Sequence, residues 1–112
     1  MIKEFKEDLQ KLFLGFLISD KELYVRVQAL VVPTYFNNKL RPAVEFINQH
    51  ADEYNSMPTV DQIRAKTELG LELDADITAR HKDWFMDEFQ DFAKFKALEQ
   101  AILASADDIE KG

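Results

Sequence analysis

The last third of this sequence places the strongest constraint on its fold. From about Ile77 to Glu110 the chain has no glycine and no proline, and its apolar residues recur at helical spacing. This segment is long for a globular helix, so it is either one long helix or two helices with a bend. The whole chain has only 3 glycines and 3 prolines, which is few for a loop-rich β fold. The sequence therefore predicts an all-α protein, a small bundle of about five or six helices that ends in a long helix.

Two helices are predicted before residue 33. The first covers about Ile2 to Ile18, where apolar residues repeat every three or four positions. The second covers about 20–31. Its start is predicted from Ser19 and Glu22, which have the spacing of a capping box, and Pro33 stops it.

Two more helices follow, separated by a proline-containing turn. The third is predicted over about 41–54, because a proline at its start is well placed at the first helical position. Pro58 prevents that helix from continuing, and Thr59 and Gln62 form the capping box of the next one. Chain reversal alone explains this turn, so we interpret it as a connector rather than a binding loop.

The chain length of 112 residues fits one domain, and a hydrophobic content of 46% is enough for a core. Within that domain we expect a compact helical head over residues 1–74 and a long closing helical segment over residues 75–112. A short loop around Gly70 joins them, and Asp74 or Asp76 is expected to cap the closing segment.

The closing segment carries two apolar stripes when its residues are placed at ~100° per residue. The first stripe contains Phe85, Phe89, Phe92 and Leu103, and the second contains Trp84, Phe95, Leu98, Ile102 and Ile109. A helix that lies on one core needs a single stripe. The second stripe indicates either a helix buried on both sides or a face that meets a partner. On the latter interpretation the candidate protein-interface residues are Phe95, Leu98, Ile102 and Ile109.

No motif for catalysis, cofactor binding or metal binding emerges. The only glycines are Gly15, Gly70 and Gly112, so a glycine-rich phosphate loop is excluded. His50 and His81 each lie two residues before an aspartate, which is unlike the spacing that places two histidines on one helical face. We therefore interpret both as surface histidines and predict no catalytic residue, no cofactor and no metal.

A row of carboxylates lies along the closing segment. Asp83, Asp87 and Asp91 repeat every four residues and line one helical face. Such a row can hold a hard cation or perform acid–base chemistry, but on an exposed helix it is usually a solvated surface.

The charge balance excludes some partners. The net charge is −7 and the pI is about 4.8, whereas nucleic acids are bound mainly by lysines and arginines that neutralise phosphates. We expect no direct binding to nucleic acid and, for the same reason, none to an anionic membrane surface. The apolar run near the N-terminus is too short to span a bilayer. The chain has no cysteine, which suits a reducing cytosol.

Three stretches, taken in order, carry a resemblance to a known family. They are "LFLGFLISDKELYVRVQALVVPTYF", "AVEFINQHADEYNSMPTVDQI" and "HKDWFMDEFQDFAKFKALEQAILASADDI". Together they span most of the chain. The sequence resembles the N-terminal domain of replicative hexameric DNA helicases, most nearly those of T-even-type phages and more distantly the bacterial DnaB family.

The resemblance implies a small helical head followed by a helical hairpin, of which the closing segment would be the first arm. It also implies a non-catalytic assembly and interaction domain, with the ATPase motor in a separate domain beyond Gly112. Expected partners are other helicase subunits and a primase or helicase loader, in the cytoplasm of the host cell. The alternative is a stand-alone acidic regulator, or a DNA mimic that binds a DNA-processing enzyme. Its support is the charge of −7 and the aspartate row.

Overall fold

The computed structural model describes residues 5–71 and 79–111, with side chains described for 5–71 and 81–104. The elements in order are α1 (Glu7–Ser19), α2 (Lys21–Val27), η1 (Gln28–Leu30), η2 (Pro33–Tyr35), α3 (Arg41–Tyr54), α4 (Val60–Thr67) and α5 (Ala79–Lys111). The two η elements are short 3-10 turns. These described residues contain five α-helices and no strand, which confirms the all-α prediction.

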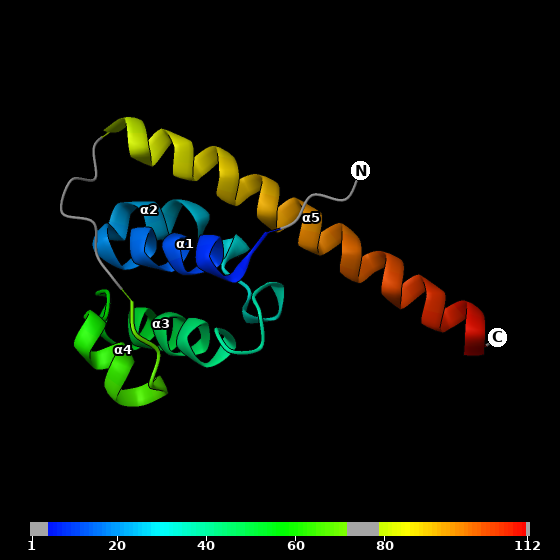
Figure 1. Cartoon of the computed structure of the whole chain (residues 1–112), viewed down its shortest axis with the longest axis horizontal. Coiled ribbons are helices and arrows are strands. Elements are labelled where there is room, and N and C mark those ends of the chain that lie inside the picture. Colours follow the sequence, from blue (N-terminus) through cyan, green and yellow to red (C-terminus); the bar gives the residue numbers. More distant parts are fainter. Residues whose placement is uncertain (1–4, 72–78, 112) are drawn as a thin grey trace.

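The helices are arranged around a middle layer formed by α1 and α2. The first half of α5 crosses one side of this layer, and α3 and α4 pack together on the other side (Figure 1). The second half of α5 extends beyond the other helices (Figure 1). The whole molecule measures 50 × 30 × 23 Å along its principal axes. Residues 5–71 are called the head below.

Phenylalanine rings fill the core between α1 and α5. Phe13 of α1 contacts Phe89 and Phe92 of α5, with ring centroids 5.5 and 5.4 Å apart. Phe36, from the segment that connects α2 and α3, lies 5.1 Å from Phe92. All four rings are almost completely buried. Each such aromatic pair contributes ~0.5–1.5 kcal/mol beyond its area burial, so the first half of α5 is an integral part of the core.

The N-terminal helices differ from their predicted bounds. Helix α1 begins at Glu7, because Lys6 has an extended backbone; the predicted start at Ile2 lies outside the described residues. The cap of α2 is Asp20 rather than Ser19. The Asp20 carboxylate accepts a hydrogen bond from the Glu22 N–H at 2.9 Å. The Ser19 hydroxyl instead donates to the Phe16 carbonyl at the end of α1, so it cannot cap α2.

The second helix is also shorter than predicted, since α2 ends at Val27 and η1 replaces its last turn. The sequence explains the early end of α2 only in part. Pro33 ends the helical pattern, but the helix stops six residues before it.

The later helices agree with the sequence analysis. Helix α3 has the predicted bounds and ends at Asn55, which takes the left-handed conformation with φ of 52°. The Thr59 hydroxyl accepts from the Gln62 N–H at 3.1 Å, and the Gln62 side chain accepts from the Thr59 N–H at 2.9 Å. This confirms the capping box of α4. Helix α5 is one continuous helix, so the alternative of two helices is wrong. The predicted caps Asp74 and Asp76 lie outside the described residues.

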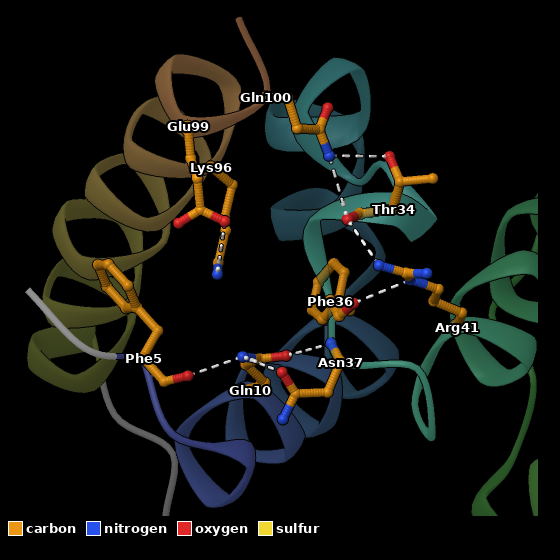
Figure 2. A network of polar contacts seen from close by, with 9 residues as sticks. All are labelled: Phe5, Gln10, Thr34, Phe36, Asn37, Arg41, Lys96, Glu99 and Gln100. Carbon is orange, nitrogen blue, oxygen red and sulfur yellow. Dashed lines mark hydrogen bonds and ion pairs between the residues drawn. The ribbon is translucent and has the colours of Figure 1, made fainter. Parts of the chain in front are cut away.

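A polar network holds the segment between α2 and α3 against three helices (Figure 2). From α1, the buried Gln10 side chain accepts from the Asn37 N–H at 2.8 Å. From α3, the Arg41 guanidinium donates to the Thr34 carbonyl at 3.3 Å. From α5, the Gln100 side chain donates to the same carbonyl at 3.1 Å. The segment therefore ties α5 to the head at the level of Gln100.

Candidate protein interface

Helix α5 passes from the core to the surface near Phe95. The side chains of Phe85, Phe89 and Phe92 are fully buried. Phe95 is half-buried, and its ring lies 5.9 Å from that of Phe5. One turn later Leu98 is 60% exposed. The predicted second stripe is therefore partly exposed at its first residue, Trp84, which is 40% exposed, and from Phe95 it passes from the edge of the core into solvent.

The exposed part of that stripe is called the α5 ridge and consists of Leu98 and Ile102, which is 59% exposed. The two side chains are one helical turn apart, so they form a continuous apolar strip. Four residues were candidates for the interface. Leu98 and Ile102 form the α5 ridge, and Phe95 lies at the inner end of that ridge. The side chain of Ile109 lies outside the described residues.

One residue of the first predicted stripe does not lie in the core. Leu103 was grouped with the three buried phenylalanines, but it is 59% exposed. Helix α5 continues past the other helices (Figure 1), and its apolar residues keep the same helical spacing there. Periodicity gives the direction of a side chain and carries no information on whether anything lies there to bury it. The alanines Ala97, Ala101 and Ala104 are likewise exposed and widen the apolar surface.

Charged residues flank the α5 ridge on both sides. Lys94 lies four residues before Leu98 and is exposed. Glu99 follows Leu98 directly, and its carboxylate lies 3.8 Å from the Lys96 ammonium. At ~100° per residue, Lys94 and Glu99 fall on opposite sides of Leu98. The ridge thus has a lysine on one flank and the ion pair of Glu99 and Lys96 on the other.

The aspartate row occupies the earlier part of α5. Asp83, Asp87 and Asp91 are all exposed. No group of three or more histidine, cysteine or acidic side chains that could hold a metal ion occurs among the described residues.

Next to this row, the Lys82 ammonium lies 2.6 Å from the Asp20 carboxylate. This hydrogen bond is the main reason why the pKa of Asp20 is below its ordinary value. The Glu22 N–H lowers the pKa further, while burial opposes both effects. The pair joins the start of α5 to the cap of α2.

A second surface feature is an open groove of about 650 Å³ between α3 and α4. Its α3 wall is a row of three rings one turn apart. The ring of His50 lies 5.7 Å from that of Phe46 and 4.7 Å from that of Tyr54. The α4 wall contains Ala65 and Lys66. We call this feature the α3–α4 groove.

This groove was not predicted from the sequence. One sequence pattern could have indicated it. Phe46, His50 and Tyr54 recur at every fourth residue, which gives α3 a second face beside the buried one. His50 was interpreted as a surface histidine, but it is half-buried between two rings. Tyr54 is 65% exposed, so the end of the row is open to solvent.

Comparisons with known proteins identify no relative. No family model, no curated protein and no solved structure matches this chain. Across residues 5–71 and 79–111, no helix combines the length and apolar character that crossing a membrane requires.

Proposed function

We propose that this chain is a non-catalytic assembly and protein-interaction domain of a replicative hexameric DNA helicase of the T-even phage type. The observation that carries the proposal is the α5 ridge. Helix α5 uses its first half to build the core and presents exposed apolar side chains in its second half.

An exposed apolar strip on a projecting helix is characteristic of a protein interface. A collar domain needs such a surface, because it must contact other helicase subunits and a primase or helicase loader. The order of the three stretches that resemble helicase N-terminal domains supports the same assignment. ATP hydrolysis and DNA unwinding would belong to a separate motor domain.

The test is to replace both ridge residues, Leu98 and Ile102, with glutamate. We expect the parent chain to self-associate weakly, and the double variant to be monomeric with unchanged helix content. Light scattering behind a sizing column, with circular dichroism on the same samples, measures both properties. The matched control is Val25→Glu, because Val25 is 57% exposed on α2, away from the ridge.

Two results would contradict the proposal. If the double variant unfolds while Val25→Glu remains folded, the ridge contributes to the core rather than to an interface. If the parent chain stays monomeric at high concentration and binds neither primase nor loader, the ridge has no partner of the proposed kind.

The second candidate function is an acidic regulator or DNA mimic, which the exposed carboxylates of Asp83 and Asp87 favour. Reading the coding sequence past the codon for Gly112 separates the two. A downstream phosphate-binding loop of the form G-x-x-x-x-G-K-[ST] supports the helicase assignment. A stop codon soon after Gly112 favours the regulator.

A further inference from the structure

The α3–α4 groove and the α5 ridge lie in different parts of the molecule. Helices α3 and α4, which form the groove, lie on the side of α1 and α2 opposite the first half of α5, and the second half of α5 extends outward (Figure 1). The ridge of a chain is therefore not placed to enter the groove of the same chain. The described part of each chain thus carries an apolar strip and an aromatic groove, and both are open to solvent.

The charges at the two surfaces are complementary. The groove has a carboxylate, Glu53, on its α3 wall and an ammonium group, Lys66, on its α4 wall. The ridge has Lys94 on one flank and, on the other, Glu99, which is already ion-paired with Lys96. A helix in a groove can point in either of two directions, and reversing it exchanges its flanks. One direction brings Lys94 beside Glu53, and the other brings it beside Lys66.

We propose that the α5 ridge of one chain docks into the α3–α4 groove of a second copy. Leu98 and Ile102 would pack on the rings of His50 and Tyr54, as the apolar face of a helix does in a groove. Lys94 would lie beside Glu53. The inference rests on the proposed function, since it names the partner of the ridge.

The contact has a consequence for assembly. It joins two different surfaces, so it is heterologous, and a docked pair still offers one free ridge on one chain and one free groove on the other. A heterologous contact generates a closed ring if its rotation closes and an open filament if it does not. A pairing of two α5 ridges would instead stop at a dimer.

The first test uses a groove variant and a ridge variant. Ala65→Glu places a charged side chain in the groove at an exposed position of α4. The ridge variant carries Leu98→Glu and Ile102→Glu. We expect each variant alone to be monomeric. Mixing the two leaves one intact groove and one intact ridge, so the mixture should form a discrete heterodimer with no larger species, as measured by light scattering and sedimentation.

The outcome also separates this inference from the proposed function. If the groove variant associates as the parent does while the ridge variant is monomeric, the ridge meets another surface. The docking inference is then wrong, and the interface on α5 stands. If neither variant alters the association of the parent, both the inference and the role of the ridge are wrong.

The second test reverses one charge pair. We expect Glu53→Lys and Lys94→Glu each to weaken self-association about fivefold, which is the loss of affinity expected when one partly exposed ion pair is removed. The double variant should recover the parent affinity. Glu45→Lys is the control, because Glu45 is exposed on α3 and does not line the groove. If both single variants lose affinity and the double variant does not recover it, the pairing of Lys94 with Glu53 is wrong.

Discussion

Gln10 shows how one buried polar residue joins distant segments. Its side chain is completely buried in α1, donates to the Phe5 carbonyl at 2.7 Å, and accepts from the Asn37 N–H at 2.8 Å (Figure 2). Buried polar groups are nearly always paired in this way, because an unpaired one loses its hydration without compensation. No other polar side chain is fully buried in the described part of the chain.

Replacing Gln10 with leucine should lower the free energy of unfolding by ~1–3 kcal/mol. Leucine fills a similar volume, but the Asn37 N–H and the Phe5 carbonyl each lose the hydrogen bond to Gln10. Chemical denaturation measures the change, with Gln90→Leu as the control at an exposed position of α5. Equal stabilities for the two variants would mean that water replaces the lost hydrogen bonds.

The pair of Asp20 and Lys82 makes stability depend on pH. The folded-state pKa of Asp20 is below its ordinary value of 3.8, chiefly through the Lys82 hydrogen bond. A carboxyl with a lowered pKa stabilises the fold at pH values above the ordinary pKa. That contribution is lost as the pH falls through the folded-state pKa.

We therefore expect Asp20→Asn to be less stable than the parent at neutral pH by up to about 1 kcal/mol, because the pair is partly exposed. Asparagine keeps the helix cap, so the variant removes mainly the charge. The difference should shrink below pH ~4, as the unfolded-state carboxyl protonates. Thermal melts from pH 7 to pH 2 measure it. A difference that is constant with pH would show that the ion pair contributes nothing.

At the scale of the element, the capping box of α4 is a structural feature with a measurable contribution. Thr59→Ala should destabilise the fold by ~1 kcal/mol, because the Gln62 N–H loses its acceptor. Self-association should be unchanged. Thr59→Ser is the control, because it retains the hydroxyl. If alanine abolished association without changing the thermal stability, the turn before α4 would be part of a binding site.

Helix α5 combines two environments in one regular backbone. Phe85 and Phe89 are fully buried, whereas Leu98 and Ile102 are about 60% exposed. The helical pattern is the same in both halves, so local propensity cannot distinguish them. The difference arises because the head covers only the first half (Figure 1). The Gln100 hydrogen bond to Thr34 marks the level at which the head still contacts the helix.

At the scale of the whole molecule, the net charge of −7 limits the partners. We expect little or no binding to double-stranded DNA at physiological salt, since affinity for DNA requires several lysine or arginine contacts with phosphates. Fluorescence anisotropy at two salt concentrations tests this. A sub-micromolar affinity that falls steeply with added salt would contradict it.

The helices, their approximate order and the Thr59 cap could be predicted from the sequence alone, because these features depend on neighbours within a few positions. Apolar spacing, proline placement and capping residues are local signals, and they located α3 to within a residue of its observed bounds. The predicted cap of α2, Ser19, was wrong and Asp20 takes that place, since both residues have the right chemistry and only the fold brings Lys82 to Asp20.

Burial along α5 and the opening between α3 and α4 depend on which segments lie side by side, and residue spacing does not carry that information. Leu103 follows the period of the buried phenylalanines yet lies in solvent, because no other part of the head reaches it. His50 is half-buried because the rings of Phe46 and Tyr54 lie against it, and the groove beside it exists only where α4 packs against α3. These properties come from long-range packing, which orients each helix face toward another element or toward water.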